Sequence, residues 1–369
     1  MGSKVLLQII PALGSGGAER GALDVAKKAV DLGWRSFIVS HGGSLEQEAS
    51  DAGVELAHLP LHAKSPRTLW SNAQQLRRLV QDIKPDIVHI RSRAPAWSAY
   101  WAGIPSNMVV TTYHGTYNAQ NALKRRYNRI MLRAKRVICI SKFIHTHVCA
   151  EHPGHEGKLR IIPRGIDLNK YRFQLLPEDP SDDRPIVLLP GRLTRWKGQM
   201  LLLEALKELP LEKRNFHVRI MGDAQGRGAY EQSLHDFSRR YGLDTMVSFQ
   251  PAQMDMPQAY GQAHIVVIPS LDPEAFGRVP VEAQAMGRVV VAAYHGGAME
   301  TMGAEGSCFP FDPKHAGALT HQLQAARDFL AHPAREEILA QASERVRHKF
   351  GLSQMLDHTF TVYDEVLSS

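Results

Sequence analysis

The chain has 369 residues, of which 44% are hydrophobic and 22% are charged. That length is too great for one ordinary domain and suits two of ~150–200 residues, and the composition excludes a disordered or fibrous protein. The net charge of +7 is unevenly divided, because residues 1–176 hold 25 Lys and Arg against 12 Asp and Glu, whereas the remainder holds 19 against 25. A basic half joined to an acidic half is expected to face different partners, the basic one an anionic partner.

The first half alternates short apolar strands with amphipathic helices. Strands are expected at Val5–Ile10, Ser36–Ser40, Val54–Leu59, Asp86–Ile90, Met108–Thr112 and Arg136–Ile140. Helices are expected at Gly17–Leu32, Leu69–Ile83 and Leu123–Ala134. This rhythm predicts parallel βα units with right-handed crossovers, and the strands are apolar throughout, as expected where helices cover both faces of a sheet.

The composition changes at Phe173–Pro185, where three prolines and four acidic residues without periodicity indicate a linker. A second βα series follows, with strands expected at Ile186–Pro190, Val218–Met221, Val247–Phe249, Ile265–Ile268 and Val289–Ala293. We therefore expect two doubly wound α/β domains of the Rossmann-like type, facing each other across a cleft. Their expected bounds are 1–172 for the acceptor-side domain, 173–185 for the linker, 186–350 for the donor-binding domain, and 351–369 for a C-terminal helix whose expected place is against the first domain.

Cysteine usage and hydropathy bear on location. Three cysteines, Cys139, Cys149 and Cys308, have neither a disulfide framework nor zinc-site spacing, which predicts a reducing compartment. No apolar run reaches the ~18–20 residues that span a bilayer, and Met1–Lys4 leads directly into an apolar strand, without room for a signal peptide. We expect a cytoplasmic protein.

Two loops that follow strands carry candidate phosphate-binding residues. The loop Gly14–Arg20 contains Gly16 and Gly17, and is as well explained by a tight turn as by a phosphate site. It lacks the third glycine and the later acidic residue of a dinucleotide fingerprint. In the second loop, Arg192 and Lys197 are two cations that could neutralise a diphosphate, with a solvated basic turn as the equal alternative.

A third loop runs from Glu274 to Glu282 and opens a helix. Backbone N–H groups there would form an anion site, and the candidate donors are Gly277, Arg278 and Val279. Glu282 is placed to accept hydrogen bonds from a ribose diol, and Glu274 to hold sugar hydroxyls. The alternative is two helix-start acids favoured by the helix dipole.

The spacing Glu274-x7-Glu282, preceded by Pro-Ser and followed by Ala-x-Ala-x-Gly, resembles the motif of glycosyltransferase family 4, retaining enzymes of the GT-B fold. Further matches stand in the family's order over about residues 14–300. They are Gly16–Arg20, His114-Gly115, Ile140–Lys142, Ile162–Asp167, Gly191–Leu193, Lys197-Gly198, Met221–Asp223, and His295–Gly297 with Glu300. The stretches RSRAPAWSAYWAG and TTYHGTYN are similar to bacterial members that build lipopolysaccharide core or surface polysaccharide.

The resemblance implies a role for each matching position. It implies that Arg192 and Lys197 bind the diphosphate of the donor. It also implies that Glu282 binds the ribose and Glu274 the transferred sugar. Gly16 and Gly17 would let the first domain close on the phosphates. His114 would lie at the reaction centre, so the implied catalytic residues are His114 and Glu274. One position departs from the pattern: Arg164 stands where many members have Asn, which adds a phosphate or acceptor contact or is merely a surface charge.

The resulting expectation is a hexosyltransferase-type enzyme that moves a sugar from a nucleotide diphosphate sugar to a glycan or lipid-linked acceptor in bacterial lipopolysaccharide or polysaccharide biosynthesis. No cofactor and no metal are expected, because the sequence has no Asp-x-Asp and fixed cations can stabilise the leaving diphosphate. Retention of configuration is implied by the resemblance alone. The alternatives are a GT-B nucleotide-sugar epimerase or hydrolase, a catalytically silent nucleotide-sugar-binding protein and, least favoured, a dehydrogenase.

The segment Leu123–Arg136 has seven cations in fourteen residues and apolar residues at helical core spacing. An ordinary solvated helix is one interpretation. The other is docking on an anionic membrane surface, which would make the protein peripheral on the cytoplasmic face of the inner membrane. No stacking platform or recognition motif supports nucleic acid as a partner.

Overall fold

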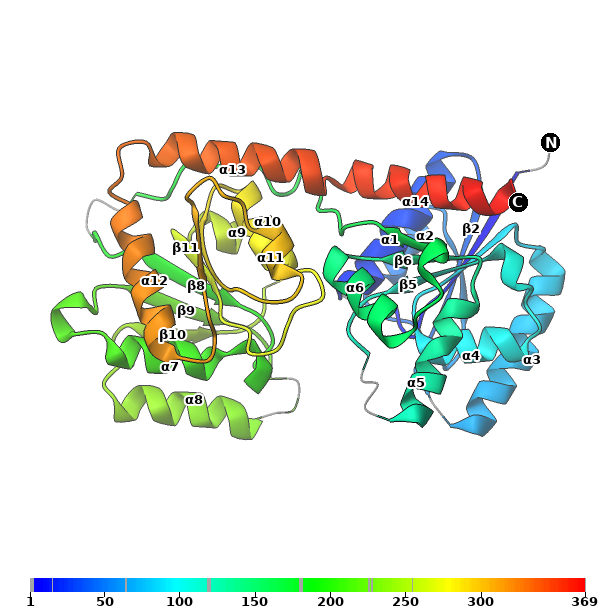
Figure 1. Cartoon of the computed structure of the whole chain (residues 1–369), viewed down its shortest axis with the longest axis horizontal. Helices are drawn as coiled ribbons and strands as arrows, with labels where there is room; N and C mark the ends of the chain where they lie inside the picture. Colours follow the sequence, from blue (N-terminus) through cyan, green and yellow to red (C-terminus); the bar gives the residue numbers. More distant parts are fainter. Residues whose placement is uncertain are drawn as a thin grey trace. The chain divides into compact units, whose positions relative to one another are not determined.

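The computed structural model describes residues 3–14, 16–63, 65–117, 121–178, 182–224, 226, 228–253 and 255–368. The chain divides into two compact units: Met1–Gly165 with Ser353–Ser369 (the first unit) and Ile166–Leu352 (the second unit). Each unit is built on one parallel sheet with helices packed around it (Figure 1).

The first unit contains a seven-stranded parallel sheet in the order β3-β2-β1-β4-β5-β6-β7. Its strands are β1 (Val5–Ile9), β2 (Arg35–Ser40), β3 (Glu55–His58), β4 (Ile87–Ile90), β5 (Val109–Tyr113), β6 (Arg136–Cys139) and β7 (Leu159–Ile161). Its helices are α1 (Gly17–Asp31), α2 (Glu46–Asp51), α3 (Pro66–Ile83), α4 (Arg93–Trp101), α5 (Ala122–Asn128), α6 (Lys142–Glu151) and, from Ser353 on, α14 (Leu352–Leu367). The strand order reverses between β1 and β4, as in doubly wound Rossmann-like sheets.

The second unit repeats this topology with six parallel strands in the order β10-β9-β8-β11-β12-β13. Its strands are β8 (Ile186–Pro190), β9 (His217–Met221), β10 (Val247–Gln250), β11 (Ile265–Ile268), β12 (Val289–Ala293) and β13 (Cys308–Phe311). Its helices are α7 (Gln199–Glu208), α8 (Gly228–Arg240), α9 (Met256–Gly261), α10 (Arg278–Ala285), α11 (Ala298–Thr301), α12 (Ala316–Phe329) and α13 (Arg335–Phe350). The prediction of two doubly wound domains is confirmed.

Several strands are buried along their whole length, polar residues included. All residues of β1, β5 and β12 are buried, because helices cover both faces of the sheets. Two strands were not predicted, β7 and β13. Both are short, and β13 contains a proline, so the sequence gives little signal for a strand at either place.

The predicted helix over Leu123–Ala134 is wrong in its second half. Helix α5 ends at Asn128, and Arg129–Arg133 form a 3₁₀ turn. Side chains of β5 hold carbonyl groups at this turn, since Tyr113 donates to the carbonyl of Asn128 at 3.2 Å and Thr111 Oγ1 to that of Met131 at 2.7 Å. Three successive residues of this turn, Ile130–Leu132, are buried, so the turn lies inside the first unit rather than on a solvated helix face.

The C-terminal helix α14 completes the first unit. The ring of Phe360 packs edge-on against Trp34 at 5.4 Å and against Tyr363 at 5.1 Å. Tyr363 is fully buried, and its hydroxyl bonds His89 Nδ1 at 2.6 Å. Residues from the end of the chain therefore form part of the core of the first unit.

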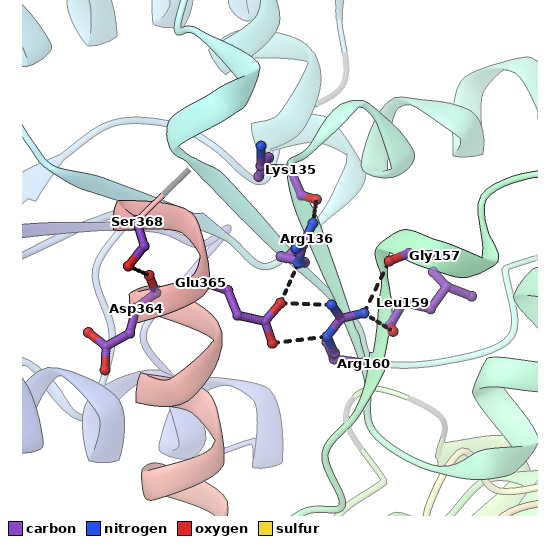
Figure 2. A network of polar contacts seen from close by, with 8 residues as sticks. All are labelled: Lys135, Arg136, Gly157, Leu159, Arg160, Asp364, Glu365 and Ser368. Atoms are coloured by element: carbon purple, nitrogen blue, oxygen red, sulfur yellow. Dashed lines mark hydrogen bonds and ion pairs between the residues drawn. The ribbon is translucent and has the colours of Figure 1, made fainter.

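A carboxylate on α14 joins two arginines of the sheet (Figure 2). Arg136 Nε lies 2.6 Å from Glu365 Oε2, and Arg160 donates from Nη2 to Oε2 at 2.7 Å and from Nε to Oε1 at 3.1 Å. Hydrogen bonds from Arg160 and then Arg136 lower the pKa of Glu365 to about 2. Arg136, predicted to be one of the cations of a membrane-docking surface, is thus already paired with a carboxylate.

We predict that Glu365→Gln lowers the free energy of unfolding by about 1–2 kcal/mol at pH 7, a value discounted for the partial exposure of the carboxylate. Because the folded-state pKa is depressed, the contribution is present above the ordinary pKa of 4.5 and is lost as the pH falls toward about 2. Urea unfolding followed by tryptophan fluorescence at several pH values measures it. The neighbouring exposed Asp364→Asn is the control, and an equal loss in both variants, or a pH-independent loss, contradicts the assignment.

Candidate active site

Three polar loops lie side by side at the carboxyl edge of the second sheet. Strands β8, β11 and β12 are neighbours in the sheet, and all run in the same direction. They lead into the loops 191–198, 269–277 and 294–297, respectively. Parallel pairing therefore gathers at one edge three segments that are far apart in sequence, which is where doubly wound sheets bind ligands.

A partly shielded ion pair joins two of these loops. Lys197 Nζ lies 2.7 Å from Glu274 Oε1, and the two side chains are only 15% and 11% exposed. Ser270 Oγ donates to the same carboxylate oxygen at 2.6 Å, and the carbonyl of Ser270 is bonded by His295 Nε2 at 2.8 Å. A fixed carboxylate with a cation beside it can receive a hydroxyl group on one side and an anionic group on the other.

Backbone geometry explains why Lys197 reaches Glu274. The short 3₁₀ turn Arg195–Lys197 ends at Gly198, which has a φ of +74°. A Cβ on Gly198 would lie 1.8 Å from the carbonyl oxygen of Pro269, so only glycine permits this approach. The amide of Leu271 donates to the carbonyl of Trp196 at 2.7 Å and holds the two loops together.

Arg192 belongs to the same edge but is exposed. Its guanidinium lies 6.0 Å from the ring centre of Trp196, and its carbonyl accepts from Gln199 Nε2 at 2.9 Å. Among the described carboxylates, none forms an ion pair with Arg192. It is therefore a cation that an anionic ligand can approach.

The third predicted loop opens helix α10. Gly277 precedes the helix with a φ of +89°, and Arg278 and Val279 are its first two residues. The first backbone N–H groups of a helix have no partner within it, so this end of α10 can donate to an anion.

Glu282 is held inside the second unit by several donors. It is 5% exposed, lies 2.8 Å from the guanidinium of Arg278, and accepts from the hydroxyl of Tyr260 at 2.9 Å. Burial, and after it the charge of Glu282, raises the pKa of both Tyr260 and Tyr171. The tyrosines therefore stay protonated and donate to the carboxylate, a role that the spacing of the motif did not reveal. A ribose contact of Glu282 stays a prediction.

In the first unit, His114 directly follows β5 and contacts Arg164. Its Nδ1 lies 2.8 Å from Arg164 Nη2, and its Nε2 is buried, with no hydrogen-bond partner among the described residues. Burial, followed by the charges of Arg164 and Arg91, holds the pKa of His114 well below 6.5. An arginine can only donate, so Nδ1 is the acceptor and the neutral ring carries its proton on Nε2.

Arg164 is not a surface charge, which settles one of the alternatives left by the sequence. It is 8% exposed, and a Cβ on Gly21 would lie 2.4 Å from its Nη1, so the guanidinium passes directly over the first turns of α1. Helix α1 begins at Gly17, with Gly16 as its N-cap. The buried cation and the helix N-terminus both favour negative charge at this end of the first sheet.

Further buried polar groups support this end of the first sheet and were missed in the sequence. Arg91 donates from Nε and Nη2 to Gln8 Oε1 at 2.9 and 2.6 Å, and His89 Nε2 lies 2.7 Å from Thr112 Oγ1. Burial lowers the pKa of Arg91 to about 10, with nearby Tyr363 and Asp24 acting against the shift. These residues lie in, or directly after, mostly apolar strands. Nothing in the sequence there resembles a binding motif, so they could not be recognised from it.

Metal-ligating side chains are not clustered in the part of the chain that the structure describes. No group of three or more His, Cys, Asp or Glu side chains there is arranged to hold a metal ion. In α6, Cys149 Sγ lies 3.8 Å from His145 Nδ1, but this is a contact within one turn of a helix.

Comparison with known proteins agrees with this architecture. A model of Glycosyltransferase Family 4 matches residues 15–170, and one of Glycosyl transferases group 1 matches residues 173–345. A crystal structure of a glycosyltransferase from Rickettsia africae is 32% identical, with a TM-score of 0.88, over 100% of this chain and 99% of that one. The chain belongs to glycosyltransferase family 4.

Other relatives of this glycosyltransferase are more distant. The lipopolysaccharide 1,2-N-acetylglucosaminetransferase of Salmonella typhimurium is 28% identical over 52% of this chain and 52% of that protein. The chain spans about half the length of such curated relatives. Anabaena Alr3699/HepE, solved in complex with UDP, shares 23% identity and a TM-score of 0.82 over 98% of this chain and all of that one, which shows the common GT-B fold.

The predicted site residues of this glycosyltransferase fall into one group in each unit. The structure brings together Lys197 and Glu274, and places Arg192 and the start of α10 at the same edge of the second sheet. Gly16, Gly17 and His114 lie in the first unit. Ser15, in the same loop as the two glycines, lies outside the described residues. The binding and catalytic roles stay predictions.

We predict that Arg164→Met raises the pKa of His114 toward its ordinary value, because a neighbouring positive charge and a donor to Nδ1 are both lost. In the parent, ¹⁵N NMR of histidine-labelled protein should show the proton of His114 on Nε2 and no protonation of the ring near pH 6.5. His114→Gln identifies the signals, and the exposed Arg172→Met is the control. A parent His114 that titrates at its ordinary pKa, or that carries its proton on Nδ1, contradicts the geometry.

Proposed function

We propose that this protein transfers a hexose from a nucleotide diphosphate sugar to a hydroxyl group of an acceptor. The observation that carries the proposal is the Lys197–Glu274 ion pair at the carboxyl edge of the second sheet, with exposed Arg192 and the start of α10 beside it. This edge offers a carboxylate for sugar hydroxyls and cations for phosphates within one set of loops.

The diphosphate is assigned to Arg192, Lys197 and the first amides of α10. The guanidinium can bind phosphate oxygens in a bidentate manner, and Lys197 retains N–H donors besides the one directed at Glu274. The UDP complex of Anabaena Alr3699/HepE, which has the same fold, supports a nucleotide as the donor's leaving part.

During transfer, the bond from the sugar's anomeric carbon to the diphosphate breaks, and its electron pair goes to the leaving nucleoside diphosphate. A bond from the anomeric carbon to the acceptor oxygen forms, and the hydroxyl proton passes to a phosphate oxygen of the leaving group. Lys197 and the α10 amides are held in place before the charge develops, and Arg192 stands at the same edge, so these groups can stabilise the leaving group with little reorganisation. We propose that they do so without a metal, consistent with the lack of Asp-x-Asp in the sequence.

His114 is assigned a donor role in this scheme. With its proton on Nε2 and Nδ1 occupied by Arg164, the ring can give a hydrogen bond to a sugar or acceptor oxygen but cannot readily accept a proton near neutral pH. Retention of configuration is proposed from membership of the family.

The acceptor is proposed to be a glycan or a lipid-linked glycan of bacterial lipopolysaccharide or surface polysaccharide. The match to the Salmonella typhimurium enzyme supports this class. None of the described helices is both long and apolar enough to cross a bilayer. We propose a peripheral location on the cytoplasmic face of the membrane, with exposed Lys124 and Arg125 of α5 among the cations that face anionic lipid.

We predict that Arg192→Ala and Lys197→Ala each weaken binding of the cognate nucleoside diphosphate by about 10- to 100-fold, the value of one charge-assisted hydrogen bond of ~1.5–3 kcal/mol. Isothermal titration with UDP and GDP measures this. Arg195→Ala removes an exposed cation from the same turn and should change affinity by less than about threefold. If Arg192 and Lys197 variants bind as the parent does, the diphosphate lies elsewhere.

A further inference from the structure

A cavity lies in the first unit between α4 and the segment α5–Arg133, where the basic segment Leu123–Arg136 lines it. Its volume is about 720 Å³, within the range of small-ligand sites. Four cations line it: Arg126, Arg129, Arg133 and Lys158. None of its lining residues is acidic.

The cavity reaches the amino edge of the first sheet, away from His114. Ser106, Arg133 and Lys158 line it and stand just before β5, β6 and β7, respectively, whereas His114 follows the carboxyl end of β5. The five residues of β5 span roughly 17 Å at ~3.4 Å per residue. A ligand in this cavity is therefore separate from the atoms that react at the opposite edge.

The cations of the cavity differ from their neighbours in the sheet. Arg136 and Arg160 share the carboxylate of Glu365 (Figure 2). Across the described residues, by contrast, none of the four cavity cations lies within ion-pair distance of a carboxylate. Their charge is left for a ligand.

The positive charge in the cavity also affects the pKa of His155, which lines it. Burial, followed by the charges of Arg129 and Lys158, lowers the pKa of His155, and Glu156 only partly opposes this. Arg129 and Lys158 therefore both lie close enough to His155 to disfavour its charged form, and an anion bound beside them would offset that positive charge.

The walls of the cavity hold two of the cations, Arg133 and Lys158, in place. The guanidinium of Arg133 lies over the ring of Tyr100 at 4.1 Å, which fixes its plane. Trp97 stacks on Tyr127 with ring centres 6.1 Å apart and donates from Nε1 to the Tyr127 carbonyl at 3.2 Å. Lys158 Nζ is tethered to the carbonyl of Leu132 at 3.4 Å. Cations fixed in advance lose less entropy when a ligand binds.

We infer that this cavity is a non-catalytic binding site for a ligand that carries two or more phosphate groups. Arginine forks match phosphate oxygens bidentately, and the volume accommodates a diphosphate with an attached sugar or headgroup. The phosphates could come from a membrane lipid or from a soluble compound, and the chemistry of recognition is the same. The inference is independent of sugar transfer, because it concerns binding at the other edge of the sheet.

The test compares two double variants of the first unit. Arg126→Gln with Arg129→Gln removes two cavity cations, and Arg67→Gln with Arg78→Gln removes two exposed cations of α3 that do not line the cavity. Both variants are made in the Arg192→Ala background, which weakens the proposed donor site. Isothermal titration with inorganic pyrophosphate should then show about 100-fold weaker binding to the cavity variant and less than about threefold change in the control, at ~1.4 kcal/mol for each contact.

Vesicle flotation distinguishes the two sources of phosphate. If the ligand is a lipid, vesicles of cardiolipin, which carries two phosphates, and phosphatidylcholine should carry the parent and the control variant but not the cavity variant at low salt. If it is soluble, pyrophosphate binding depends on the cavity while flotation does not. The inference is overturned if the parent does not bind pyrophosphate, or if the cavity and control variants lose binding equally, which would indicate diffuse charge.

Discussion

In both units every strand of the sheet runs in the same direction, and the position of each polar group depends on this constraint. Parallel strands need crossover connections, and the helices in them cover both faces of the sheet. Charged side chains of the site therefore lie in the loops at the ends of the strands. In the second unit, the carboxyl edge brings Lys197 from the loop after β8 to Glu274 from the loop after β11. In the first unit, the same edge carries His114. The separation of two edges also distinguishes the proposed reaction site from the cationic cavity.

The cations of the protein are used in three different ways. Arg136 is neutralised by Glu365 and stabilises the attachment of α14. Arg164 is buried against the neutral ring of His114 and donates to its Nδ1, which leaves the proton of the ring on Nε2. Arg192 and Arg129 are exposed, and no described carboxylate pairs with either of them. Positive charge counted along the sequence therefore overstates what is available to a membrane or ligand.

The fold was predictable because continuous apolar strands alternate with helices, and burial on both sheet faces demands that pattern. The loops after β8 and β11 were also predictable, since glycines and charged residues there follow apolar strands. The Lys197–Glu274 contact was not, because the close approach at Gly198 depends on a loop over seventy residues away. Nor could the 3₁₀ turn at Arg129–Arg133 be predicted, because side chains of β5 determine it. The hydrogen bond of Tyr363 to His89 could not be predicted either, because an aromatic residue at this position fits the apolar face of any amphipathic helix.

The most direct test of the account is a transfer assay in excess EDTA with radiolabelled UDP- and GDP-hexoses and truncated lipopolysaccharide as acceptor. The account predicts that the parent incorporates hexose with its anomeric configuration retained. Glu274→Gln should lose at least about 100-fold in turnover, roughly 2.7 kcal/mol of barrier, whereas the exposed Glu212→Gln keeps it. Hexose released without incorporation, turnover that needs an added metal, or full activity in Glu274→Gln would contradict the account.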